Sequence, residues 1–182
     1  MTISINQNIN VRDLRAKIKS KEYERLSEDT KLKLSKNSKL EVQDLVKNPI
    51  IINNPTSKEI ITKKALKLLI LEDLDEFLLE LGEGFTYIAN EYKIKIGNTY
   101  NYIDLLLFNY KYNCFVVVEL KITELKKEHI GQIQVYMNYI DRNLKSIYQD
   151  KTIGLIICKK DNKFIIEYSS DTRIFSSSYI LR

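Results

Sequence analysis

Hydrophobic and polar positions divide the chain into two stretches of different character. Residues 11–47 carry isolated apolar side chains among many charges, a spacing typical of surface helices that pack along one stripe, and we expect two or three short helices there. Residues 48–56, with Pro49, Pro55 and three asparagines, interrupt this pattern. The sequence therefore predicts a helical N-terminal arm at residues 1–49 and a second domain at residues 50–182.

Two stretches of the second domain have helical spacing. Residues 58–81 run without a break from Ser57, a suitable N-cap, to Gly82, which suits the backbone just past a helix end. A second period covers about residues 127–148. Its apolar positions are Ile130, Ile133, Tyr136, Met137 and Ile140. We expect one long helix in each stretch.

Runs of β-branched and aromatic residues predict the strands. Four runs lie at 85–90, 92–96, 100–108 and 114–121, separated by turn residues such as Gly97-Asn98, and this pattern is typical of an antiparallel meander. Two more runs, at 152–159 and 163–170, follow the second helix around a turn at 160–162. The order of elements predicts an α/β fold with a mixed central sheet flanked by helices.

Composition and charge narrow the class of protein. The chain has 182 residues, 44% of them hydrophobic, which is enough for a core that needs no disulfide or structural metal. The net charge is +5, and residues 1–49 hold +4 of it, from 11 basic and 7 acidic side chains. A polyanionic partner is plausible, and the arm is expected to position DNA or to pair two copies of the chain.

The two cysteines and the absence of long apolar runs bear on the cellular compartment. Cys114 and Cys158 lie inside apolar runs without the close spacing of zinc or redox motifs, so we expect buried thiols in a reducing cytoplasm. The sequence has no signal-peptide core and no stretch near the roughly 18 apolar residues of a membrane span. We expect a cytoplasmic protein without a membrane segment.

Three charged residues interrupt the apolar strand patterns. Asp104 lies in the run YIDLLLF, and Glu119 and Lys121 lie in FVVVELKI, where a spacing of two places both side chains on one face of a strand. An unpaired charge in such surroundings costs several kcal/mol. If the two strands pair, the Asp104 carboxylate reaches the same face. The ordinary alternative is a Glu–Lys pair at a strand end with Asp104 at a sheet edge.

A shared site for two carboxylates requires a cation or a retained proton, because like charges repel. Mg²⁺ suits such a site, since it prefers oxygen ligands and is usually held by one or two carboxylates with water and phosphate oxygens, and Mn²⁺ is expected to substitute. A neighbouring lysine can orient the attacking water or stabilise charge on a phosphate. The trio therefore predicts Mg²⁺-dependent phosphoryl chemistry.

Other candidates lie on the predicted helices. Gln132 and Tyr136 are four residues apart, so both project from one helix face, although a surface Gln beside a core Tyr is the ordinary explanation. Glu80 lies among leucines and is a possible additional metal or water ligand. His129 stands near a helix start, where we expect a solvent-exposed side chain rather than a catalytic base.

The order Asp104, Glu119-Leu120-Lys121, then Gln132 and Tyr136 resembles the PD-(D/E)XK nuclease superfamily, in particular its QxxxY-bearing branch. Whole phrases between residues 70 and 168, among them YNYIDLLLFNYKYNCFVVVELK and GQIQVYMNYID, resemble the YhcG-like group of these nucleases. The usual Pro-Asp dipeptide appears here as Ile103-Asp104. The resemblance implies that full-length members have a helical domain before the nuclease domain, so the chain looks like an N-terminally shortened member.

The resemblance implies a restriction-endonuclease-like αβββαβ core and a Mg²⁺-dependent DNA phosphodiesterase, in a family linked to restriction-modification and mobile-element defence. It implies that Asp104 and Glu119 bind the metal, with the Leu120 carbonyl as a further ligand, that Lys121 is the catalytic lysine, and that Gln132 and Tyr136 support it. The expected partners are DNA, a second copy of the chain or a restriction-modification protein. The alternative function is a nuclease fold that binds DNA or a partner without cutting.

Overall fold

The computed structural model describes residues 10–19, 21–56, 59 and 62–182. The N-terminal arm forms short helices, as the sequence predicts: α1 Val11–Lys19, the 3₁₀ turn η2 Tyr23–Arg25, α2 Glu28–Ser35 and α3 Val42–Leu45. Ser27 caps α2 through a hydrogen bond from the Thr30 N–H to its hydroxyl. In this part of the chain no helix is long and apolar enough to cross a membrane, and the same holds for the other described residues.

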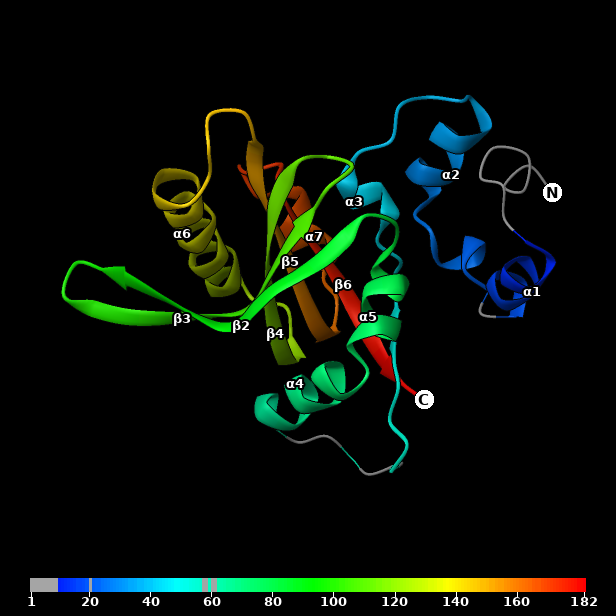
Figure 1. Cartoon of the computed structure of the whole chain (residues 1–182), viewed down its shortest axis with the longest axis horizontal. Coiled ribbons are helices and arrows are strands. Elements are labelled where there is room, and N and C mark those ends of the chain that lie inside the picture. The colour runs from blue at the N-terminus through cyan, green and yellow to red at the C-terminus, as the bar shows by residue number, and fades with distance from the viewer. Residues whose placement is uncertain (1–9, 20, 57–58, 60–61) are drawn as a thin grey trace.

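A six-stranded mixed sheet forms the centre of the molecule (Figure 1). Its strands are β1 Ile50–Ile52, β2 Phe85–Ile96, β3 Thr99–Asn109, β4 Cys114–Glu124, β5 Asp150–Lys160 and β6 Ile174–Leu181. The spatial order is β1-β6-β5-β4-β3-β2, with β2, β3 and β4 antiparallel and β5, β6 and β1 added in parallel to β4. The α/β fold with a mixed sheet is confirmed, and the helices and strands from α5 to β5 follow the αβββαβ order.

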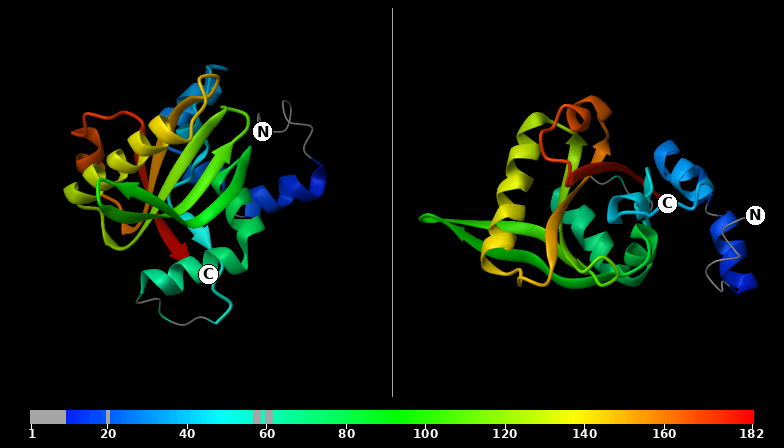
Figure 2. Two further views of the ribbon diagram at one scale, coloured as in Figure 1. Left: turned by 60° about the vertical axis from the view of Figure 1, so that its left-hand side comes forward. Right: turned by 90° about the horizontal axis from the view of Figure 1, so that it is seen from above.

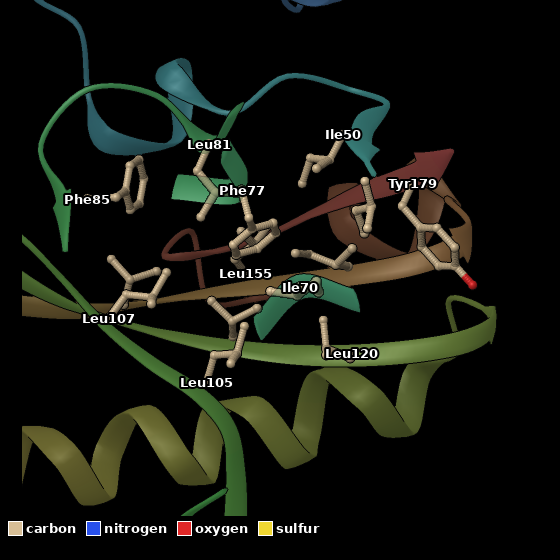
Figure 3. Close-up of a cluster of buried hydrophobic side chains, with 14 of the residues drawn as sticks. Ile50, Ile70, Phe77, Leu81, Phe85, Leu105, Leu107, Leu120, Leu155 and Tyr179 are labelled. Carbon is tan, nitrogen blue, oxygen red and sulfur yellow. The ribbon is translucent and has the colours of Figure 1, made fainter. Parts of the chain in front are cut away.

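Helices cover both faces of the sheet. On one side, α4 Lys63–Glu72 and α5 Leu74–Leu81 contribute Leu66, Ile70 and Phe77 to a core with Leu105 and Leu120 (Figure 3). On the other side, α6 Lys127–Asn143 packs Ile133, Met137 and Ile140 against the sheet residues Leu106, Val117 and Ile156. Burial on both faces explains the unbroken apolar runs of β3 and β4. Cys114 and Cys158 are buried free thiols, as predicted.

The first predicted helix is in fact two helices. Ser57, its expected cap, lies outside the described residues, and the observed cap of α4 is Thr62, whose hydroxyl accepts the Ala65 N–H. At Asp73 the backbone leaves the helical region, with φ −130° and ψ 52°, and α5 starts in a new direction. The break lets the apolar stripes of both helices, ending in Phe77 and Leu81, follow the twisted sheet.

Three further elements differ from the sequence prediction. The last predicted strand, 163–170, is the short helix α7 Lys163–Glu167, and the true last strand is β6. A single helical turn presents the adjacent Ile165 and Ile166 to the same core, which alternation along a strand would not allow. Helix α6 ends at Asn143 rather than near 148, and the two predicted strands at 85–96 form the single bulged strand β2.

Several contacts join the N-terminal arm to the second domain across the predicted boundary at residue 49. The boundary itself stays a prediction. Arg25 forms an ion pair with Glu80 of α5, and within the arm its guanidinium also donates to the Pro49 carbonyl at 2.8 Å. The ammonium group of the buried Lys47 donates a hydrogen bond to the Glu80 carbonyl at 2.5 Å. The Asn48 amide oxygen accepts the Ser178 N–H at 3.1 Å. The turn η2 and the residues that follow α3 therefore hold the arm against α5 and β6.

Candidate active site

Asp104 and Glu119 meet where β3 and β4 separate. The pairing of these strands starts at Leu105 opposite Val118, so the two acidic residues lie just beyond its end. Asp104 is 4% exposed, and its Oδ2 atom accepts the Leu120 N–H at 2.9 Å, which fixes the carboxylate against β4. Glu119 is completely buried. The strand geometry thus brings together the two carboxylates that the sequence analysis singled out.

Two lysines of α4 reach the carboxylates from the other side. Lys63 Nζ lies 2.5 Å from Asp104 Oδ2 and 3.6 Å from Glu119 Oε2. Lys67, one turn later, lies 4.0 Å from Asp104 Oδ1 and 2.6 Å from Glu91 Oε1. Sequence reasoning missed both residues. Their spacing of four is the only signal, and it is equally typical of a solvated helix face.

Lys121 connects the carboxylates to α6. Its Nζ atom lies 3.4 Å from Glu119 Oε2 and donates a hydrogen bond to Gln132 Oε1 at 2.8 Å. The Gln132 amide nitrogen in turn donates to the Tyr136 hydroxyl at 3.0 Å. Tyr136 is 5% exposed and its ring packs in the core beneath α6. The structure therefore brings the predicted carboxylates, lysine and helix pair into one connected network.

Glu80 does not join this network. Its carboxylate forms an ion pair with Arg25 and accepts the Ile51 N–H at 2.9 Å, so it links the arm to β1 and α5. The charged partner that its leucine-rich surroundings require comes from the arm. Across the described ranges no group of three or more His, Cys, Asp or Glu side chains is arranged to hold a metal ion. The site offers two side-chain carboxylates, and the Leu120 carbonyl stays a prediction.

The electrostatics of the pair follow from burial and like charge. Burial, followed by the nearby Asp104 carboxylate, raises the pKa of Glu119 from its usual 4.5 to about 7, and Lys63 and Lys121 oppose that rise. Burial disfavours the charged form of Lys63, but Glu119 and Asp104 outweigh it and raise the Lys63 pKa. A cation between the carboxylates therefore stabilises the site.

The residues present fit a hard divalent cation. Within the described residues neither buried oxygen of Glu119 accepts a hydrogen bond, although the two lysine ammonium groups lie within 4 Å. Lys63 shows that Asp104 and Glu119 converge on one positively charged group. Mg²⁺ usually takes one or two carboxylates and completes its octahedron with water or substrate oxygens. Asp104 and Glu119 would hold such an ion.

His129 has a structural role at the start of α6. Its Nδ1 atom accepts the Lys126 N–H at 3.1 Å, which closes the first turn of the helix. The side chain is half-buried rather than fully exposed as predicted. Burial, and then the positive charge of Lys121, lower its pKa. Nothing in this geometry directs His129 at the carboxylates.

Comparison with known proteins places this site in a family. Residues 43–182 match the model of the YhcG PDDEXK nuclease domain. The chain is 26% identical over 154 residues to the Escherichia coli (strain K12) protein named "Putative nuclease YhcG", a match that covers 81% of this chain and 41% of that protein. The chain thus spans about two fifths of the curated relative.

Solved structures with partial similarity include a repair endonuclease from Pyrococcus abyssi, with 19% identity, a TM-score of 0.43, and coverage of 69% of this chain and 49% of that one. The EndoMS–dsDNA2 complex gives 18% identity, a TM-score of 0.44, and coverage of 71% and 48%. The family assignment rests on the domain match, which spans most of the chain and contains all five residues of the network around Asp104 and Glu119. The chain belongs to the YhcG PDDEXK nuclease family.

Proposed function

We propose that the protein is a Mg²⁺-dependent DNA endonuclease that hydrolyses phosphodiester bonds, with Mn²⁺ as a substitute. One observation carries the proposal. The buried carboxylates Asp104 and Glu119 converge on the ammonium group of Lys63, and beside them Gln132 of α6 holds Lys121 in place. A surface ion pair requires no such burial, because removing carboxylates from water costs several kcal/mol. A bound metal ion would offset this desolvation cost, because its charge attracts both carboxylates.

The roles of the side chains follow from their contacts. Bound to Asp104 and Glu119, the metal ion would lower the pKa of a water molecule and offset charge on the phosphate. Lys121 is held between Glu119 and Gln132, beside the carboxylates, where its ammonium would stabilise the charge that develops on the reacting phosphate. Tyr136 accepts a hydrogen bond from the Gln132 amide and so positions Lys121 indirectly, through Gln132.

A cleavage assay tests the proposal. Purified protein is incubated with plasmid, linear and branched DNA in Mg²⁺ or Mn²⁺, beside Asp104→Ala, Glu119→Ala and the control Glu124→Ala, a half-exposed carboxylate of the same strand. We expect cleavage by the wild type and the control, and a loss of at least about a hundredfold in both site variants. Equal cleavage by all four proteins would disprove the assignment.

A second candidate is a nuclease fold that binds DNA or a partner protein without cutting. Its support is that Lys63 and Lys67 already neutralise the carboxylates, as they would in a site that has become structural. Calorimetry with Mn²⁺ separates the two functions. A nuclease shows saturable binding that disappears in Glu119→Gln, and a purely structural site shows none.

The biological setting belongs to the same proposal. The family resemblance favours restriction-modification or mobile-element defence, with a homodimer or a restriction-modification protein as partner. A cytoplasmic location agrees with two buried, unpaired cysteines.

A further inference from the structure

The β2–β3 hairpin extends beyond the rest of the sheet. Pairing of β3 with β4 starts at Leu105, whereas β2 and β3 stay paired out to Ile96 and Thr99. Residues 92–103 therefore form a two-stranded arm, closed by Gly97 with φ +59°. Figures 1 and 2 show it projecting at the opposite end of the molecule from α1 and α2.

One face of this hairpin arm is anchored and the other is open. Ile94 and Ile103 are 1% and 0% exposed and belong to the core beneath α6. Because side chains alternate along a strand, the side chains next to these isoleucines, those of Lys93 and Lys95 on β2 and of Tyr102 on β3, face away from that core. Tyr100 and Tyr102, on this second face, are 53% and 52% exposed. A two-stranded ribbon is marginal by itself, so the buried isoleucines hold the open face in position.

The open face is basic and aromatic. Lys93 is paired with Tyr102, and Lys95 with Tyr100. Lys93 Nζ lies 3.9 Å from the centre of the Tyr100 ring and Lys95 Nζ lies 5.8 Å from it, so the ring restrains both ammonium groups. Residues 92–103 contain no acidic side chain. The face therefore presents two positive charges and two phenol hydroxyls without a competing carboxylate of its own.

This face is continuous with the candidate active site. Asp104 follows Tyr102 by two residues on β3, and Glu91 precedes Lys93 by two on β2. Lys67 contacts both Asp104 and Glu91, so these residues share the side of the hairpin that α4 approaches. Glu91, the carboxylate next to Lys93, is already paired with Lys67. A polyanion bound at Asp104 and Glu119 would continue along Lys93 and Lys95.

We propose that the open face of the hairpin arm, formed by Lys93, Lys95, Tyr100 and Tyr102, binds the sugar–phosphate backbone of duplex DNA beside the phosphate that is cut. The inference rests on the proposed nuclease function and names where its substrate extends. Ammonium groups and phenol hydroxyls contact phosphate oxygens without reading sequence. Stacking on unpaired bases is disfavoured, because Lys93 occupies a face of the Tyr100 ring.

Binding measurements without catalysis test this surface. Fluorescence anisotropy with a duplex of about 30 base pairs is recorded in EDTA over a salt series, for the wild type and for Lys93→Gln/Lys95→Gln. The matched control is Lys111→Gln/Lys151→Gln, two exposed lysines at the opposite end of the sheet strands. We expect the arm variant to bind roughly tenfold more weakly, with a log–log salt slope smaller by about 2, since each lost phosphate contact removes about 0.9.

The outcomes separate this inference from the proposed function. If wild type cuts DNA and the arm variant binds like the wild type or the control, the inference is overturned and the nuclease function stands. If the arm variant loses affinity but wild type never cuts, the arm binds DNA and the nuclease function fails. Binding of a single-stranded oligonucleotide is measured as well. If Tyr102→Leu weakens it more than the two lysine substitutions do, the arm binds by base stacking and not by backbone contact, and the inference is overturned. No DNA binding by the wild type would overturn the inference.

Discussion

Neutralising Glu119 is expected to remove a pH dependence of stability. The carboxyl group is completely buried, and burial together with Asp104 raises its pKa from 4.5 to about 7. Below pH 4.5 the group is protonated in both the folded and the unfolded protein, so it contributes no pH dependence. Between 4.5 and about 7 the unfolded chain releases the proton and the folded chain retains it, so the free energy of unfolding falls as pH rises. Above about 7 the full cost is present and the curve levels off.

The size of the effect follows from the shift. Each pKa unit corresponds to about 1.4 kcal/mol, so a rise from 4.5 to about 7 costs the folded protein about 3 kcal/mol at pH 8. Glu119→Gln resembles the protonated carboxyl in shape and stays neutral. The free energy of unfolding of the variant, relative to wild type, should therefore increase by about 2–3 kcal/mol between pH 5 and pH 8, because a small part of the difference is already present at pH 5.

Urea unfolding at pH 5, 6, 7 and 8 measures this difference directly. EDTA is included, because a bound divalent ion would stabilise the ionised carboxylate and hide the effect. Glu124→Gln, on the same strand with a side chain 46% exposed, is the control and should follow wild type at every pH. If the Glu119→Gln and wild-type curves stay parallel from pH 5 to 8, the buried like-charge pair is not the source of strain that the geometry indicates.

Three further changes have defined outcomes. Lys121→Met should lower single-turnover cleavage by roughly a hundredfold with little change in DNA affinity, because the ammonium acts on charge that develops during the reaction; equal losses in both would make it a phosphate anchor. Lys63→Met removes the cation that competes for Asp104 and Glu119, so calorimetry should show Mn²⁺ binding tighter by roughly tenfold, and weaker binding would contradict the competition. Gly154→Val should destabilise the fold by about 1–3 kcal/mol in thermal unfolding, since even a Cβ atom there lies 2.5 Å from Met137 Sδ and 2.9 Å from Ile133 Cδ1; an unchanged melting temperature would show that α6 moves freely on β5.

Local sequence patterns predicted most of the sheet and the two carboxylates at its centre. Alternation and apolar runs located most strands, because a strand buried on both faces must be apolar along its length. The same rule made Asp104 and Glu119 conspicuous, since a carboxylate is costly there without a cation. The spacing of four also placed Gln132 and Tyr136 on one helix face, whereas their support of Lys121 was expected from the family resemblance.

Only the tertiary structure decided which distant charges meet. Lys63 and Lys67 lie on a helix some 40 residues before Asp104, and their spacing is the same as that of any solvated lysine pair. Glu80 looked like a candidate ligand until the arm placed Arg25 beside it, 55 residues away in sequence. The break at Asp73 and the helical turn of α7 likewise arise from packing on a twisted sheet. Periodicity reports the burial of one segment, whereas the partner of a buried charge is set by the three-dimensional path of the whole chain.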